Sequence, residues 1–378
     1  MRLIPTARVP DGAELGRDVL IGRADGIPLL RAGVRVTQRY RDRLLSAGIN
    51  AIYVEDDESE GIIPEPIVSE ETRAIATRAI ATAYRETQSA LTSGTPLGPG
   101  TLQTLTEVIE RILREIDESG GVALALSDLL CADAYTFQHS IDVTALGLLL
   151  AQHLFREQGW IDYDGVRRFS RIDERLSELG LGLLLHDIGK LAIPISILNK
   201  PGKLTAAEWE VMKTHPRAGV DLLRGDTWSP LVKAVVLRHH ERCDGSGYPD
   251  GKVGSEIHEM ALIAAIADVY DAVTSERVYA PARPACDGVQ AIMQGAGTLF
   301  DAEIAAVFAR VVAPYPPGVE IEVSDGRRGI VVSVPNQALD RPVVRILDGP
   351  GSPCEVSLLR NPSLRIAGWD PVPAAAAA

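Results

Sequence analysis

Hydrophobic and polar positions divide the chain into three stretches of different character. In residues 1–65, short apolar runs alternate with turn signals, which predicts short strands, and the segment 36–47 predicts one helix. From 69 to about 308, apolar residues recur at helical spacing between Gly and Pro clusters. After Pro314, apolar runs broken by Asp-Gly turn signals predict strands. The pattern therefore predicts a mainly α protein with a small module at each end.

These changes of pattern suggest how the chain divides into parts. We expect an α+β N-terminal module at 1–65, a helical linker region at 66–124, a helical domain at 125–313, and a β-rich C-terminal module with a frayed tail at 314–378. The linker region opens on a long Ala-rich helix after Ser69. That helix could form a homodimer contact, or it could pack on its own domain.

Composition narrows the class of protein. The chain has 378 residues, a hydrophobic share of 46% and a net charge of −13. Dominant disorder is excluded by this balance, and a general affinity for DNA, RNA or anionic membranes is not expected. No apolar run approaches the roughly 20 residues of a membrane span, no signal peptide is recognisable, and the four cysteines are widely spaced. We expect a soluble, cytoplasmic protein.

Histidines and aspartates in the helical stretch carry the candidate chemistry. All seven histidines of the chain lie in this stretch. His186 and Asp187 end an apolar run, and Asp268 lies in a segment that is apolar around the whole helix, so these side chains are expected to be buried. Each one alone could be a satisfied core polar group. Together, buried imidazoles and carboxylates are typical of a transition-metal site. We expect the pairs His186-Asp187 and His239-His240 to lie on helices, where adjacent side chains point about 100° apart, so that each pair could address two metals.

Six short motifs follow one another in order along the helical stretch. The matching pieces are YTFQHS at 135–140, LLHDIGKLAIP at 184–194, ILNKPGKLTAAEW at 197–209, KTHPRAG at 213–219, HHERCDGSGYP at 239–249 and IADVYDAVTSERVY at 266–279. In order and spacing the chain resembles the HD-GYP domain, a subgroup of the HD-superfamily metal-dependent phosphohydrolases that degrades the bacterial messenger cyclic di-GMP. The resemblance implies an HD-type helical bundle as the core of 125–313.

The resemblance also implies a metal site and a reaction. One metal would be held by His139, His186, Asp187 and Asp268, and the second by Asp187, His215, His239 and His240. Two divalent transition metals per chain are expected, with Fe or Mn first, because a mixed imidazole and carboxylate set suits them. A hydroxide held between the metals would hydrolyse cyclic di-GMP to pGpG, with further hydrolysis to GMP as an option. Asp187 would be a catalytic residue as well as a ligand.

Further residues are implied at the substrate. Lys190 lies i+3 from Asp187, so it could contact phosphate or stabilise the transition state, the alternative being an ordinary exposed lysine. Gly247, Tyr248 and Pro249 could contact the substrate or only shape a loop. Arg277 would face substrate phosphate or end a helix in solvent. Asp271 and Thr274 could orient ligands or lie on a helix surface.

Three positions depart from the family pattern and leave alternatives open. Tyr135 stands where some members have a Glu that holds a third metal, so two metals are expected. Ala280 replaces a cation, and Cys243 replaces a large aromatic residue that would wall a guanine base. The protein could therefore be a weakly active or inactive metal-containing cyclic di-GMP receptor or scaffold, which signals to a partner through its flanking modules. An HD phosphohydrolase for another nucleotide is the third alternative.

Overall fold

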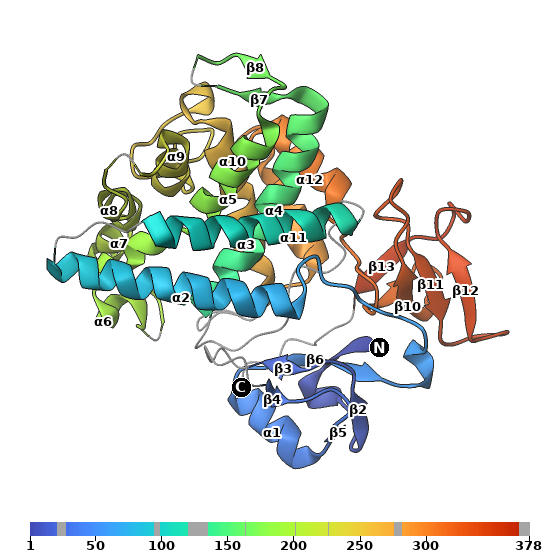
Figure 1. The fold of residues 1–378 in the computed structure, drawn as a ribbon. Coiled ribbons are helices and arrows are strands. Elements are labelled where there is room, and N and C mark those ends of the chain that lie inside the picture. Colours follow the sequence, from blue (N-terminus) through green and yellow to red (C-terminus); the bar gives the residue numbers. More distant parts are fainter. Residues whose placement is uncertain are drawn as a thin grey trace.

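The computed structural model describes residues 1–20, 28–93, 99–119, 135–162, 164–200, 202–225, 227–275 and 282–369. A large helical body, a small N-terminal module and a C-terminal sheet are visible as separate parts (Figure 1). The predicted mainly α fold with a small module at each end is confirmed. Across the described ranges, no helix combines the length and apolar character needed to cross a lipid bilayer.

The N-terminal module is a small α+β unit, as predicted. Its elements are β1 (Arg2–Pro5), η1 (Thr6–Arg8), β2 (Ala13–Leu15), β3 (Val19–Leu20), β4 (Pro28–Leu30), β5 (Arg35–Val36), α1 (Gln38–Ser46), β6 (Ala51–Glu55) and η2 (Asp57–Ser59). Four strands form a sheet in the order β1-β6-β2-β5, in which Arg2 faces Val54. Leu15, Val36 and Leu44 fill its core, so α1 packs on this sheet with its apolar side.

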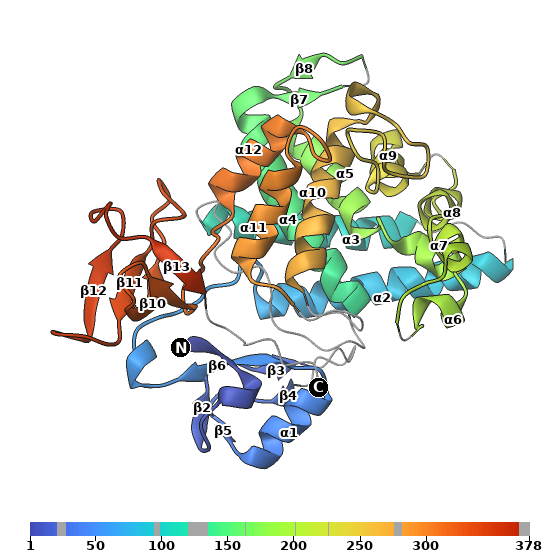
Figure 2. The same ribbon diagram turned by 180° about the vertical axis from the view of Figure 1, so that it is seen from behind.

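The helical body is built around two buried helices, α4 and α10. Its elements are α2 (Glu70–Ser93), α3 (Pro99–Glu118), α4 (Tyr135–Gln158), β7 (Trp160–Ile161), β8 (Arg167–Arg168), α5 (Ile172–Leu184), η4 (Ile188–Ala192), α6 (Ile195–Leu198), α7 (Ala206–Met212), α8 (His215–Leu222), α9 (Pro230–Arg238), η5 (Gly254–Glu256), α10 (Glu259–Thr274), α11 (Ala285–Gly295) and α12 (Ala302–Val311). Helix α10 lies beside α11 (Figure 2) and contacts α4, α9, α11 and α12. Residues Met260 to Asp268 are all buried, as the all-round apolar pattern predicts.

The Ala-rich helix α2 packs within its own chain. Helices α2 and α3 lie side by side across one face of the body (Figure 1), and α2 also contacts α4. Ala76, Ile80 and Ile109 belong to the same hydrophobic core as α4, α5 and α10. The guanidinium of Arg73 on α2 donates to Oδ1 of Asp142 on α4 at 2.7 Å, which adds a buried polar contact between these helices. The boundaries at 65, 124 and 313 stay predictions.

The C-terminal sheet contacts the N-terminal module. Its strands are β9 (Glu320–Val323), β10 (Arg328–Ser333), β11 (Val343–Ile346), β12 (Cys354–Ser357) and β13 (Ile366–Trp369), arranged antiparallel in the order β12-β11-β10-β9-β13. The amide of Leu3 donates to the carbonyl of Gly318 at 2.9 Å. The guanidinium of Arg345 donates to the carbonyls of Glu58 and Glu60 at 3.1 and 2.7 Å. These bonds join the two terminal modules directly.

Candidate metal centre

Residues from five segments meet at one end of the buried helices. His139 lies on α4 and Asp268 on α10, His215 is the first residue of α8, and the pairs His186-Asp187 and His239-His240 follow α5 and α9. The expectation that both pairs lie within helices is wrong. Helix α5 ends at Leu184 and α9 at Arg238, so each pair stands in the turn beyond its helix. Turn geometry lets neighbouring side chains converge on one site, whereas adjacent helical residues diverge by about 100°.

Asp187 lies between two pairs of histidines. Its Oδ2 is 3.4 Å from Nε2 of His186 and 3.7 Å from Nε2 of His139. Its Oδ1 is 3.4 Å from Nε2 of His215 and 3.9 Å from Nε2 of His239. Within the described part of the chain, this Oδ1 is buried and has no hydrogen-bond partner. A buried carboxylate oxygen without a donor calls for a cation, so the residues present fit a metal.

Asp268 and His240 complete the cluster. Oδ1 of Asp268 lies 3.3 Å from Nε2 of His139, and its Oδ2 lies 3.4 Å from Nδ1 of His240. Ligand atoms of Asp187, His215, His239 and His240 lie within 4.8 Å of one another, and so do those of His139, His186 and Asp187. Asp268 is not in either of these compact groups. It contacts one histidine from each.

Four of the five histidines are oriented by a hydrogen bond at Nδ1. The Nδ1 of His186 donates to the carbonyl of Leu183 at 2.7 Å. His215 and His239 make the same bond to the carbonyls of Met212 and Val236 at 2.9 and 3.0 Å, and His139 bonds Asp271 at 2.6 Å. Because a carbonyl or carboxylate only accepts, Nδ1 carries a proton in all four rings, and Nε2 is the nitrogen that offers a lone pair when the ring is neutral. These four Nε2 atoms are the ones that face the carboxylates of the cluster.

Burial and charge set the protonation of the cluster. Burial lowers the pKa of His215, and it lowers the pKa of His240 to about 3. Burial would lower the pKa of His139 too, but its hydrogen bonds to Asp268 and Asp271 raise that pKa to about 9. Burial would raise the pKa of Asp187, yet Lys190 and His186 hold it well below its ordinary value. The low pKa values of His215 and His240 keep these imidazoles neutral, the form that binds cations, whereas His139 has to release a proton before its Nε2 can bind a cation.

Asp271 orients His139 by its contacts, whereas the hydroxyl of Thr274 bonds the backbone of its own helix. Oδ2 of Asp271 bonds His139, and its Oδ1 accepts a hydrogen bond from Ser275 at 2.8 Å. The hydroxyl of Thr274 donates to the carbonyl of Tyr270, one turn back on the same helix. These contacts favour the orienting interpretation of Asp271, which stays a prediction.

Two glycines bring the turn after α5 against α8, and the sequence analysis missed both. A Cβ on Gly189 would lie 1.9 Å from the carbonyl oxygen of His215 and 2.5 Å from the amide nitrogen of Gly219. A Cβ on Gly219 would lie 2.7 Å from a methyl carbon of Val236. Only glycine permits so close a backbone approach. This packing places Asp187 beside His215, and the "DIGK" motif gave the only sequence signal for it.

The expected substrate residues are placed around this cluster where the structure describes them. Nζ of Lys190 donates to Oδ2 of Asp187 at 2.5 Å. The ring of Tyr248 lies 4.7 Å from the ring of His240, between centroids. Gly247 packs against the backbone of the preceding turn, where a Cβ would lie 2.4 Å from the amide nitrogen of Arg242. Pro249 follows in the same loop and is partly buried.

Glu241 organises that loop and was also missed. Its buried carboxylate accepts hydrogen bonds from the amides of Asp250 and Lys252 at 2.8 and 3.0 Å. A buried acid next to two histidines looks like a ligand in the sequence, yet here it holds the loop backbone. Cys243 packs against the hydrophobic core. Arg277 and Ala280 lie outside the described residues, as does the side chain of Tyr135.

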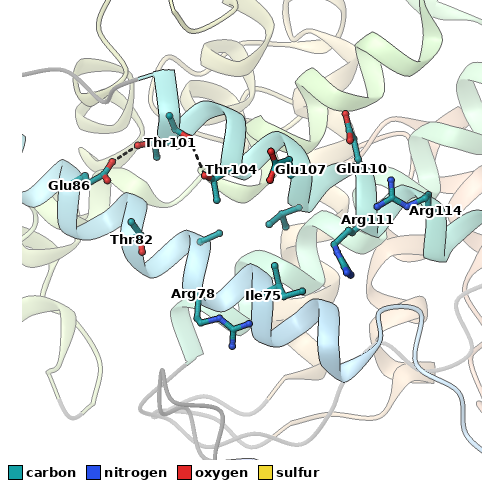
Figure 3. Close-up of a pocket in the computed structure, with 13 residues that line it drawn as sticks. Ile75, Arg78, Thr82, Glu86, Thr101, Thr104, Glu107, Glu110, Arg111 and Arg114 are labelled. Carbon is teal, nitrogen blue, oxygen red and sulfur yellow. Dashed lines mark hydrogen bonds between the residues drawn. The ribbon is translucent and has the colours of Figure 1, made fainter.

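Two cavities lie away from the cluster. One of about 480 Å³ lies between α2 and α3, where Figure 3 shows Thr82 and Glu86 on one helix and Thr104 and Arg111 on the other. The second, of about 870 Å³, is lined by parts of α9, η5, the start of α10 and the β7–β8 hairpin. Neither is lined by any of the seven clustered residues. The candidate metal site is therefore a different place in the fold from both cavities.

Comparisons with known proteins show which family model and which relatives this chain is similar to. A family model described as "HD domain" matches residues 167–304. The cyclic di-GMP phosphodiesterase PA4108 of Pseudomonas aeruginosa is 35% identical over 242 residues, which cover 64% of this chain and 55% of that protein. The cyclic di-GMP phosphodiesterase response regulator RpfG of Xanthomonas campestris is 47% identical over 131 residues, 34% of this chain and 35% of that protein. The chain thus spans about half or less of the length of these relatives.

Two further similarities cover less of the chain or have lower sequence identity. The 3'3'-cGAMP-specific phosphodiesterase 2 of Vibrio cholerae is 47% identical over 97 residues, 25% of this chain and 19% of that protein. Among solved structures, the HDG"Y"P protein Bd1817 of Bdellovibrio bacteriovorus aligns with a TM-score of 0.45 and 16% identity, over 81% of this chain and 97% of that one.

Residues 167–304, which hold six of the seven clustered residues, match the HD-domain model. Within that superfamily, the resemblance to HD-GYP proteins predicted from the motifs is confirmed.

Proposed function

We propose that this chain is a metal-dependent phosphodiesterase that hydrolyses cyclic di-GMP. The observation that carries the proposal is the position of Asp187, whose two oxygens face different histidine pairs while its buried Oδ1 has no donor among the described residues. A carboxylate so placed suits two cations that share it. The names of the relatives support the substrate, since PA4108 and RpfG are cyclic di-GMP phosphodiesterases.

The seven clustered residues would hold two divalent metals. His139, His186 and Asp268 would bind the first, His215, His239 and His240 the second, and Asp187 both. Fe and Mn suit a set of imidazole nitrogens and carboxylate oxygens. When bound, such metals polarise the phosphoryl group and activate water at neutral pH. In this dinuclear mechanism the protein supplies the fixed Nε2 atoms and excludes bulk solvent, because six of the seven side chains are at most 9% exposed.

Lys190 and the loop after His240 would act on the substrate itself. Lys190 is partly exposed and already next to Asp187, so its ammonium can turn to a phosphoryl oxygen and neutralise the charge that develops there. Gly247, Tyr248 and Pro249 form a loop held by Glu241 at the exposed edge of the cluster. We propose that this loop positions the substrate and that Arg277 adds a phosphate contact.

Metal counting with product analysis tests the proposal. Protein purified without oxygen is reconstituted with Fe²⁺ or Mn²⁺, and cyclic di-GMP is converted with pGpG as the first product and GMP as the later one. Asp187→Asn should lose metal and activity together, because it removes the shared ligand. Asp221→Asn is the matched control, since that carboxylate is 72% exposed on α8. Two bound metals without any product would contradict the proposal.

The mixed-purine messenger 3'3'-cGAMP is the second candidate substrate. The similarity to 3'3'-cGAMP-specific phosphodiesterase 2 of Vibrio cholerae favours testing it. The two messengers differ in one base, so the reaction at phosphorus is the same and only base recognition differs. Comparing kcat/KM for both substrates under one metal condition decides between them.

A receptor or scaffold role is the alternative to catalysis. Ala280 in place of a family cation favours it, because a weaker phosphate contact would slow turnover more than binding. A receptor binds cyclic di-GMP and leaves it intact in the metal-loaded state. Equilibrium binding measured beside product formation separates the two functions.

A further inference from the structure

The cluster opens to solvent on one side. His240 is the most exposed of the seven residues, with 17% of its side chain accessible, whereas His139, Asp187 and His215 are at most 2% exposed. Lys190, whose Nζ contacts Asp187, is 30% exposed. A substrate therefore approaches past His240 and Lys190.

An aromatic surface leads outward from this opening. The ring of Tyr248 tilts by 33° against the ring of His240, with centroids 4.7 Å apart. The indole of Trp209 stands edge-on to Tyr248 at 5.9 Å. Trp209 is 45% exposed, which is unusual for so large an aromatic side chain. The surface thus begins at a candidate metal ligand and ends in solvent.

The backbone holds Trp209 in place. Thr205 and Glu208 form a capping box at the start of α7, with the amide of Glu208 bonded to the hydroxyl of Thr205 at 3.3 Å and the amide of Thr205 to the carboxylate of Glu208 at 2.7 Å. The amide of Trp209 continues the turn by donating to the carbonyl of Thr205 at 2.9 Å. An exposed indole on a capped helix is preorganised for stacking and loses little freedom on binding.

We propose that Trp209 is a specificity-determining residue that stacks with a purine base of the substrate. This inference rests on the proposed function. A nucleobase is joined to its phosphate through one ribose, so a phosphate at the cluster places the base farther out along the surface. Tyr248 and Trp209 occupy that position, whereas Cys243 faces the hydrophobic core. Bases stack on aromatic side chains with about 1–3 kcal/mol each.

The test compares Trp209→Ala and Trp209→Phe with a matched control, Ile195→Ala. Ile195 lies on α6, which packs beside α7, and it is 74% exposed, so its truncation removes apolar surface near the site without removing a ring. Trp209→Ala should raise KM for cyclic di-GMP by about 5- to 150-fold, which corresponds to the stacking energy, and leave kcat and metal content unchanged. Trp209→Phe should keep most of the affinity for cyclic di-GMP, and Ile195→Ala should keep all of that affinity.

A binding assay makes the role of the base explicit. GMP and ribose 5-phosphate share the ribose phosphate, and only GMP has a base. With metal-loaded protein, Trp209→Ala should weaken GMP binding and leave ribose 5-phosphate binding unchanged.

An unchanged KM, or an equal loss of affinity for GMP and ribose 5-phosphate, overturns the inference while wild-type turnover still supports the proposed function. If wild type binds cyclic di-GMP without turnover and Trp209→Ala weakens binding, the stacking role stands and the phosphodiesterase does not. If wild type neither binds nor hydrolyses it, both are overturned.

Discussion

His139 and Asp271 are 132 residues apart in the chain, and their side chains meet at 2.6 Å. Nδ1 of His139 on α4 donates to Oδ2 of Asp271 on α10, while the same carboxylate accepts a second bond from Ser275. This pair turns Nε2 of His139 toward Asp268 and Asp187. The two most buried helices of the body are therefore joined at the candidate metal centre by an orienting hydrogen bond.

Removing this bond should weaken metal binding. Asp271→Ala leaves His139 without its acceptor, and loss of such an outer partner typically lowers metal affinity about 10- to 100-fold. Asp271→Asn keeps an oxygen that can accept from Nδ1, so its loss should be smaller. Chelator competition on reconstituted protein measures both. Equal affinity in wild type and Asp271→Ala would show that packing alone orients His139.

Lys190 should matter for turnover more than for metal content. Its ammonium contacts Asp187 but is no metal ligand, because it has no lone pair when charged. Lys190→Met should keep both metals and lower kcat for cyclic di-GMP about 10²- to 10³-fold, the usual cost of removing one group that stabilises transition-state charge. Single-turnover kinetics and metal analysis on the same preparation check this. Metal loss in parallel with activity would instead make Lys190 a structural partner of Asp187.

Gly189 should tolerate no side chain. A Cβ there overlaps the carbonyl of His215, so Gly189→Ala forces the turn after α5 away from α8. We expect destabilisation by about 3 kcal/mol or more and loss of metal from the His215 side. Gly100→Ala is the matched control, because that glycine lies in helix α3 with open space around its Cα, where alanine should be neutral or stabilising by about 0.5–1 kcal/mol. Thermal unfolding of the two variants decides the point.

The sequence predicted which histidines and aspartates form the cluster better than it predicted how the fold brings them together. Apolar runs that end in His186-Asp187 and contain Asp268 were sufficient to expect burial, and the ordered motifs brought the other histidines into one site. What local patterns cannot show is contact across the chain. The closeness of Gly189 to His215, the bonds from Glu241 to its loop and the pairing of His139 with Asp271 depend on how α4, α8 and α10 pack. The helical placement of both His pairs was wrong because helix ends are poorly marked in apolar runs.

Asp142 should make stability depend on pH near neutrality. Burial raises its pKa to about 7, against the opposing effect of Arg73, and the charge of Asp271 adds to the rise. The folded protein therefore keeps a proton here that the unfolded chain releases near its ordinary value of 3.8. The stability gained from this proton is complete below about pH 4 and is lost as pH rises toward 7.

Asp142→Asn carries no such proton, and an amide can still bond Gln138. Denaturant unfolding between pH 5 and 8 should show wild type losing stability relative to this variant as pH rises, levelling off above about 7. A constant difference across that range would mean that Arg73 keeps Asp142 ionised throughout.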